Sequence, residues 1–170
     1  GTGRTRIGSL LNDFWEYDPS TNTWTQKADF AGAARYGATG FSIINKGYIG
    51  TGEGSVYYND FWEYDPTLNT WTQKVNFSGG ARSGATGFNI ESKGYIGTGY
   101  FYPYYYTDFW KYNPATNSWT QKANFLGGKR CNATGLSIGS KGYIGMGLYH
   151  ESTGYVFKND FWEYNPITNH

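Results

Sequence analysis

A block of about fifty residues recurs along the chain, and this periodicity constrains the fold more than any other property of the sequence. An aromatic hexad of the type Asp-Phe-Trp-Glu-Tyr-Asp begins at Asp13, Asp60, Asp108 and Asp160, so its spacings are 47, 48 and 52 residues. Two further markers keep the same rhythm: a Trp-Thr-Gln-Lys tetrad, at Trp24, Trp71 and Trp119, and a Lys-Gly-Tyr-Ile-Gly pentad, at Lys46, Lys93 and Lys141. Such a period indicates stacked units that bury apolar surface against their neighbours.

Each repeat contains four short segments that are typical of β-strands. In one unit these segments are 38–43, 48–50, 61–64 and 71–74, with turns predicted at 45–47 and 65–69. Alternation predicts that Phe61 and Glu63 face one side of the sheet while Trp62 and Tyr64 face the other. Four antiparallel strands in each unit of about 50 residues predict an all-β chain of propeller blades.

Small residues indicate which strand of each blade lies innermost. An Ala-Thr-Gly triplet opens the first strand at Ala38, Ala85 and Ala133. The innermost strands of a propeller crowd around one axis, and glycine permits close backbone approach there. The large rings are expected further out, where neighbouring blades diverge.

Composition excludes several classes of function. The net charge is +1, from 14 basic and 13 acidic residues, so we expect no nucleic-acid partner. No stretch approaches the roughly 18 consecutive apolar residues of a membrane span. The 25 glycines, the 17 tyrosines and an aromatic content of 21% favour short strands, tight turns and ring-filled packing.

These markers resemble the kelch repeat, in which a glycine pair ends the second strand and a tryptophan follows at a set distance. The resemblance covers the whole chain, and the Tyr-Asp-Pro…Asn-Thr-Trp run is its most specific part. One departure is that the glycine pair becomes Gly-x-Gly here, at Gly50, Gly97 and Gly145. The sequence of the repeats also resembles that of bacterial secreted or cell-surface kelch proteins and of the galactose oxidase-like propeller. This resemblance implies that the protein is secreted or lies at the cell surface.

The predicted architecture is a kelch-type β-propeller fragment of about three and a half blades. Residues 1–30 would form the outer half of a blade, 33–77 and 80–125 whole blades, and 128–170 a blade lacking its last strand. Kelch propellers usually close with six or seven blades. We therefore expect that the remainder of a longer chain is needed to close the ring, with two copies completing a seven-bladed ring as the alternative.

No cofactor, metal site or catalytic residue is predicted. Galactose oxidase-like chemistry needs copper held by two histidines and two tyrosines, one of them cross-linked to a cysteine. His150 and His170 do not recur, and Cys131 is interpreted as a packed variant of the repeat. The recurring aspartates lack the spacing of a calcium loop and are predicted to fix loops by hydrogen bonds. A sialic acid mutarotase-like enzyme is a second alternative, although near-uniform repeats favour a scaffold.

Two sets of residues are candidates for ligand binding. Arg35, Arg82 and Arg130 precede the inner strands, where they would either grip ligand carboxylates or brace their own blades. The loops 4–9, 53–58, 100–106 and 148–157 differ between repeats, and variable loops on a rigid scaffold often carry binding. Their tyrosines offer large contact area and a hydroxyl, or else pack onto their own blades; the candidates are Tyr57, Tyr58, Tyr100, Tyr102, Tyr104, Tyr105 and Tyr149.

The sequence thus predicts a non-catalytic binding or adhesion scaffold whose partner is a protein or a glycan. The alternative is the propeller part of a carbohydrate-active or oxidase-like enzyme whose catalytic residues lie outside this chain.

Overall fold

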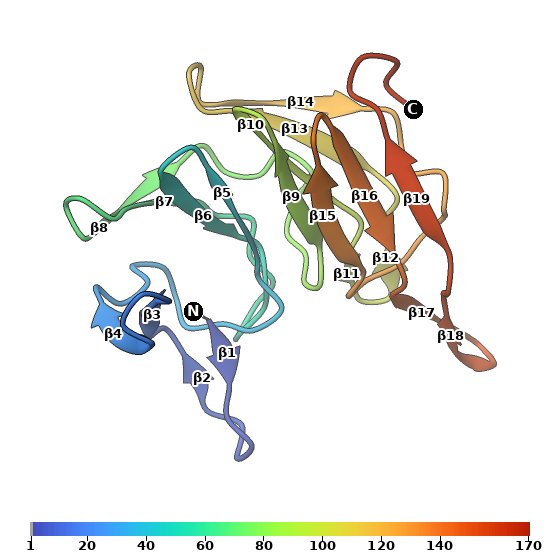
Figure 1. Cartoon of the computed structure of the whole chain (residues 1–170). Coiled ribbons are helices and arrows are strands. Elements are labelled where there is room, and N and C mark those ends of the chain that lie inside the picture. The colour runs from blue at the N-terminus through green and yellow to red at the C-terminus, as the bar shows by residue number, and fades with distance from the viewer. Residues whose placement is uncertain (1) are drawn as a thin grey trace.

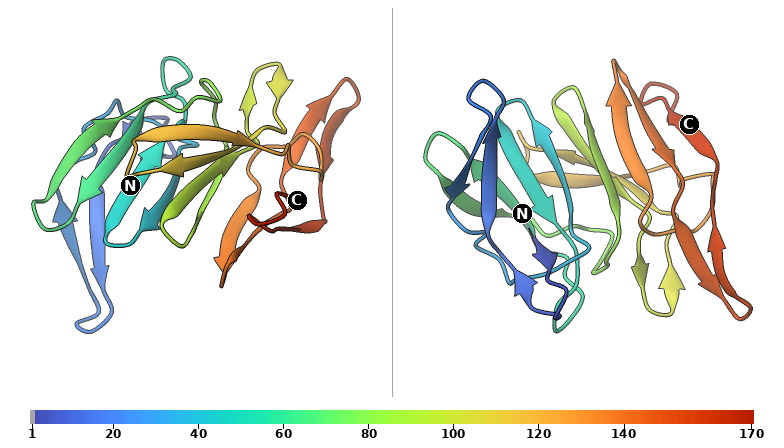
Figure 2. Two further views of the ribbon diagram at one scale, coloured as in Figure 1. Left: turned by 90° about the horizontal axis from the view of Figure 1, so that it is seen from above. Right: turned by 60° about the horizontal axis from the view of Figure 1, so that its bottom comes forward.

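The computed structural model describes residues 2–170, and every regular element in that range is a β-strand (Figure 1). Since this range contains no helix, it contains none that is long and apolar enough to cross a membrane. Four main antiparallel sheets follow one another along the chain and lie side by side (Figure 2). The prediction of an all-β chain built from antiparallel propeller blades is therefore confirmed.

Each main sheet is one blade or part of one. The first contains β3 (Phe14–Asp18) and β4 (Thr23–Lys27). The second has the order β5 (Thr39–Ile43), β6 (Lys46–Gly50), β7 (Phe61–Asp65), β8 (Thr70–Lys74). The third has the order β9 (Thr86–Ile90), β10 (Lys93–Gly97), β13 (Phe109–Asn113), β14 (Ser118–Lys122). The fourth contains β15 (Thr134–Ile138), β16 (Lys141–Gly145), β19 (Phe161–Tyr164). Gly1, in the predicted half-blade 1–30, lies outside the described residues.

Small hairpins project beside the blades, where the sequence predicts only loops. They are β1 (Gly3–Arg4) with β2 (Leu10–Leu11), β11 (Tyr100–Phe101) with β12 (Tyr104–Tyr105), and β17 (Leu148–Glu151) with β18 (Gly154–Phe157). Two of their turns contain a glycine with positive φ, Gly8 and Gly154. Residues with a side chain rarely adopt this backbone conformation. The turn predicted at 45–47 lies at 44–45 instead, because the strands pair as far as Ile43 with Lys46.

Successive blades contact one another through their first and second strands. The Thr86 hydroxyl of β9 donates a hydrogen bond to the carbonyl of Ala133, which lies just before β15 (3.1 Å). A side chain at Gly94 would overlap the Phe41 ring of the preceding blade, and one at Gly142 would overlap Phe88 in the same way. Glycine at these positions therefore lets one blade approach the next.

Rings fill the space further out. Phe14, Phe61 and Phe109 of the third strands each meet a tyrosine of the following blade edge-on, with 4.8 Å between centroids; these partners are Tyr64, Tyr112 and Tyr164. Phe61 thus faces the following blade, whereas Tyr64 faces the preceding one. The predicted alternation along the third strand is confirmed, and it explains how a single strand packs against two neighbours.

Candidate functional site

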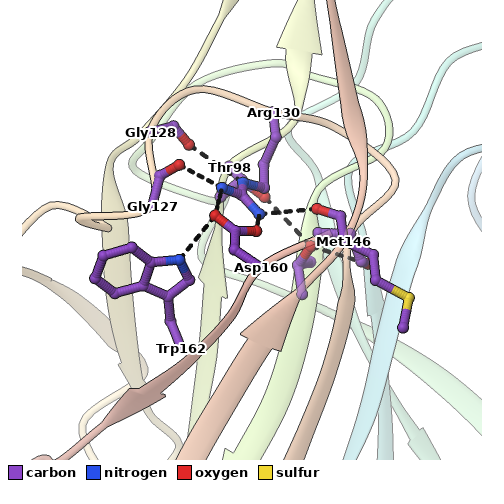
Figure 3. A network of polar contacts seen from close by, with 9 residues as sticks. Thr98, Gly127, Gly128, Arg130, Met146, Asp160 and Trp162 are labelled. Atoms are coloured by element: carbon purple, nitrogen blue, oxygen red, sulfur yellow. Dashed lines mark hydrogen bonds and ion pairs between the residues drawn. The ribbon is translucent and has the colours of Figure 1, made fainter. Parts of the chain in front are cut away.

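The three recurring arginines occupy equivalent places inside their blades. Arg35, Arg82 and Arg130 are each fully buried, and each pairs through two nitrogens with the aspartate that opens the third strand of its own blade. Figure 3 shows the arrangement around Arg130 and Asp160, whose Nη–Oδ distances are 2.5 and 2.8 Å. We call this pair and its counterparts the arginine–aspartate clamps.

Every N–H group of the Arg82 guanidinium donates a hydrogen bond within its blade. In Arg82, Nη1 donates to Asp108 and to the carbonyl of Thr98 (2.9 Å), while Nη2 donates to Asp108 and to the carbonyl of Gly79, and Nε to that of Gly80. These account for the five N–H groups of an arginine. The residue between the two repeat glycines has φ near +60° in each blade, which directs its carbonyl toward the arginine; these residues are Thr51, Thr98 and Met146.

The contacts of these arginines favour the bracing interpretation over the ligand-gripping one, which stays a prediction. Their guanidinium groups are enclosed, and a ligand carboxylate would have to displace an aspartate that already forms two charge-assisted hydrogen bonds. Tyr58 belongs to the Arg35–Asp60 clamp, since the Arg35 Cζ lies 4.1 Å from the centroid of the Tyr58 ring. The Phe30 ring also contacts this guanidinium, with its centroid 4.9 Å from the Arg35 Cζ. The alternative interpretation, that each arginine braces its own blade, agrees with these contacts.

The Arg130–Asp160 clamp makes the stability of the fold change with pH in the acid range. Hydrogen bonds from Arg130 lower the pKa of Asp160 to about 2, against the cost of desolvation. Because the folded-state pKa lies below the unfolded one, the clamp stabilises fully above about pH 4 and loses its effect as the pH falls toward 2. We expect the difference in melting temperature between the wild type and Asp160→Asn to shrink over this range. A difference that stays constant from pH 5 to pH 2 would contradict this expectation.

The second candidate region is an aromatic surface formed by the segments that differ between repeats. Its centre is the hairpin β11–β12, in which Tyr100 pairs with Tyr105 and Phe101 with Tyr104. Tyr102, which precedes Pro103 in the turn, is 68% exposed and Tyr104 is 66% exposed. We call the following set the tyrosine surface: Tyr57, Tyr100, Phe101, Tyr102, Tyr104, Tyr105 and Tyr149.

Ring contacts join this surface across three blades. Tyr57 of the second blade lies 4.7 Å from Phe101 and 5.7 Å from Tyr100 of the third blade, between ring centroids. Tyr105 in turn lies 6.3 Å from Tyr149 of the fourth blade. The rings therefore support one another, so the exposed members stand on an ordered base rather than on isolated loops.

A buried carboxylate anchors the base of the tyrosine surface. Glu53 accepts a hydrogen bond from the Tyr100 hydroxyl (2.8 Å), and its backbone exchanges two hydrogen bonds with Tyr36 (2.9 Å each). Its carboxylate also raises the pKa of Tyr36 by hydrogen bonding. The other repeats have Arg4, Tyr100 and Leu148 at this position, so the carboxylate of Glu53 is a feature that the other repeats lack.

Cations border the surface at one end. The ammonium groups of Lys129 and Lys158 lie 4.7 and 5.2 Å from the ring centroid of Tyr149.

Burial is the main cause of a raised pKa at Tyr57, Tyr100 and Tyr105. These phenols therefore stay protonated at neutral pH and can donate hydrogen bonds.

The structure thus separates the predicted site residues into two groups. Tyr58 and the three arginines belong to the clamps, whereas the other six tyrosines share the tyrosine surface. Glu53 and Phe101 lie in the predicted loops 53–58 and 100–106 but were not among the predicted site residues, and Tyr36 lies outside those loops. Glu53 could have been found from its departure from the repeat, whereas Phe101 and Tyr36 carry no local signal of their contacts.

Other candidate chemistry remains dispersed. Cys131 is buried and free, and its surroundings raise its pKa to about 11 through desolvation, so its thiol is not activated. His150 lies against Tyr155 with 4.9 Å between ring centroids. Within residues 2–170, no three or more His, Cys, Asp and Glu side chains gather closely enough to hold a metal ion.

Comparisons with known proteins support the propeller fold in two ways. The model of the Kelch motif matches residues 2–30. The solved structure of YjhT superposes with a TM-score of 0.78 at 16% sequence identity, and the alignment covers 98% of this chain and 53% of that one. The chain therefore spans about half the length of YjhT, and at this identity the likeness concerns the fold alone. No curated protein matches.

Proposed function

Because this chain is a kelch-repeat β-propeller, we propose that it acts as a non-catalytic binding scaffold whose tyrosine surface takes up a glycan or a protein. The observation that carries the proposal is the exposure of Tyr102 and Tyr104 on a base of mutually supporting rings from three blades. Sugar rings and peptides both stack on such faces, and phenols add hydrogen bonds at little cost in rotamer entropy.

The different positions of repeated and variable residues support this function. The repeated residues build the clamps and the inter-blade rings, whereas the residues that differ form the exposed surface. Function in scaffold proteins resides in sites placed on a rigid fold. Burial raises the pKa of Tyr57, Tyr100 and Tyr105 further from neutrality, which suits these phenols to donating hydrogen bonds rather than to proton transfer.

Glycan and protein arrays test the proposal. We expect the wild-type chain to bind at least one arrayed ligand and the double variant Tyr102→Ala/Tyr104→Ala to lose that signal by tenfold or more. Trp24→Ala is the control, since Trp24 is a similarly exposed aromatic residue that lies outside the tyrosine surface. Equal binding by the double variant and the wild type would refute the assignment of the site.

A further inference from the structure

We propose that the third blade binds a dianionic tetrahedral group, such as sulfate or phosphate, at a site distinct from the tyrosine surface. The site lies on the side of the blade that carries Lys93 of β10, Lys111 of β13 and Lys122 of β14. We call these three residues the lysine face. Each of them is partly exposed to solvent.

The strand register places the three lysines on one side of the sheet. Lys111 lies opposite Tyr95 of β10 and opposite Thr120 of β14. Lys93 and Lys122 are each two positions from these partners, and residues two apart on a strand share a face. Both are therefore diagonal neighbours of Lys111, a spacing across which long side chains can interact.

In the other three blades a glutamate occupies the position of the central lysine. In the second blade the Glu63 carboxylate accepts a hydrogen bond from the Tyr48 hydroxyl (2.6 Å) and lies 3.6 Å from the Lys74 ammonium group. The equivalent residues Glu16 and Glu163 each also have a lysine ammonium group within 3.6 Å. A carboxylate is therefore the acceptor at the centre of this face in three of the four blades.

The third blade keeps the donors of this arrangement but has lost the acceptor. Lys111 replaces the glutamate and lies opposite Tyr95, the counterpart of Tyr48. Lys122 is the counterpart of Lys74. Within residues 2–170, neither lysine forms an ion pair. Two ammonium groups and a phenol are thus placed where the other blades hold a carboxylate.

A second carboxylate is also missing from this face. In the second blade Asp65 pairs with Lys46. The counterpart of Asp65 in the third blade is Asn113, whose side chain accepts a hydrogen bond from the Lys93 ammonium group (3.1 Å). Because the amide of Asn113 is uncharged, it leaves the positive charge of Lys93 unbalanced.

Glu91, in the turn before Lys93, provides one negative charge near the lysine face. Burial is the main cause of the raised pKa of Tyr95, and the charge of Glu91 adds to it. The three lysines contribute +3 and Glu91 contributes −1, which leaves +2. This excess favours a dianion over a single carboxylate, and lysine ammonium groups commonly bind phosphate as point charges.

A complete neighbouring blade leaves this face accessible. The same side of the second blade faces the complete third blade, yet the side chains of Lys46, Glu63 and Lys74 keep 29, 21 and 20% of their surface exposed. The lysine face therefore lies at positions that reach solvent even between two whole blades.

Titration of the chain with sodium sulfate tests the proposal, with amide chemical shifts as the readout and sodium chloride keeping the ionic strength constant. We expect saturable shift changes at Tyr95, Lys111 and Thr120. Lys111→Glu restores the residue of the other blades, so this variant should fold and bind sulfate about tenfold or more weakly, as for the loss of a hydrogen bond to a charged group. Equal affinity in this variant and the wild type, or shifts no larger than those caused by chloride, would overturn the proposal.

The second blade supplies a matched gain-of-function variant. Glu63→Lys/Asp65→Asn gives that blade the residues of the third, so we expect the folded double variant to bind two sulfate ions instead of one. If it still bound one, the arrangement of lysines would not be the cause of binding and the proposal would be overturned. Glu91→Gln should tighten sulfate binding in the third blade by about two- to fivefold, the scale of one exposed charge pair.

A sulfated monosaccharide, compared with its unsulfated form and with inorganic sulfate and phosphate, identifies the source of the group. Tighter binding of the sulfated sugar than of free sulfate would assign a glycan source, and the reverse order would assign a free ion. Either order supports the site provided that Lys111→Glu weakens binding. Equal binding of the sulfated and unsulfated sugars would contradict it.

Discussion

Asp108→Ala is expected to lower the free energy of unfolding by about 3–5 kcal/mol, the range for breaking a buried ion pair by removing one partner. The substitution leaves Arg82 fully buried with two of its N–H groups unmatched. It also removes the acceptor of the Trp110 indole (2.7 Å). The clamp joins the link before the inner strand to the start of the third strand, so its loss loosens the whole blade. Urea unfolding followed by tryptophan fluorescence measures the effect.

Asp13→Ala provides the matched control for this measurement. Asp13 opens the third strand of the first blade and accepts a hydrogen bond from Trp15 (2.6 Å), and among the described residues it pairs with no arginine. Its replacement is expected to cost about 1 kcal/mol, as for the loss of one hydrogen bond. If Asp108→Ala and Asp13→Ala destabilised the chain equally, the clamp would not have the structural role assigned to it.

Phe61→Ala is the second substitution with a large expected effect, again about 3–5 kcal/mol, because it removes a fully buried ring and leaves a cavity. Phe61 has no exposed surface and contacts Tyr48 of its own blade and Tyr112 and Trp119 of the next. The loss therefore falls on the boundary between two blades. Chemical denaturation again measures the change in unfolding free energy.

The repeat supplies a control with the same residue in a different environment. Phe161 has the position of Phe61 in the fourth blade, but it is 58% exposed. Phe161→Ala is expected to cost about 1 kcal/mol or less, because most of its ring is already in water. Similar losses from both variants would show that these rings act within their own blades instead of between blades.

Much of the fold could be predicted because the repeat states the same pattern several times. The four strands of a blade and the two faces of its third strand follow from the repeat and from local alternation. Asn69 adopts the left-handed conformation (φ 53°) that its turn requires. The hairpins such as β11–β12 could not be predicted in this way, because their pairing occurs in segments that differ between repeats.

The site was less predictable because it depends on contacts between distant residues. The three arginines recur, but recurrence is equally compatible with a ligand site and with a structural brace. The structure favours the brace, because an aspartate 25 to 30 positions later meets each guanidinium. Likewise, Tyr57 and Phe101 are far apart in sequence, and only the packing of one blade on the next brings their rings together.

The central claim is that successive repeats lie side by side, because the tyrosine surface exists only if residues of three blades meet. One nuclear Overhauser spectrum of the chain tests it most directly. We predict cross-peaks between the Gly94 α-protons and the Phe41 ring, between Gly142 and Phe88, and between the Tyr57 and Phe101 rings. Gly47 should show its nearest contacts to Tyr64 within its own blade. Cross-peaks confined to single repeats would contradict the claim.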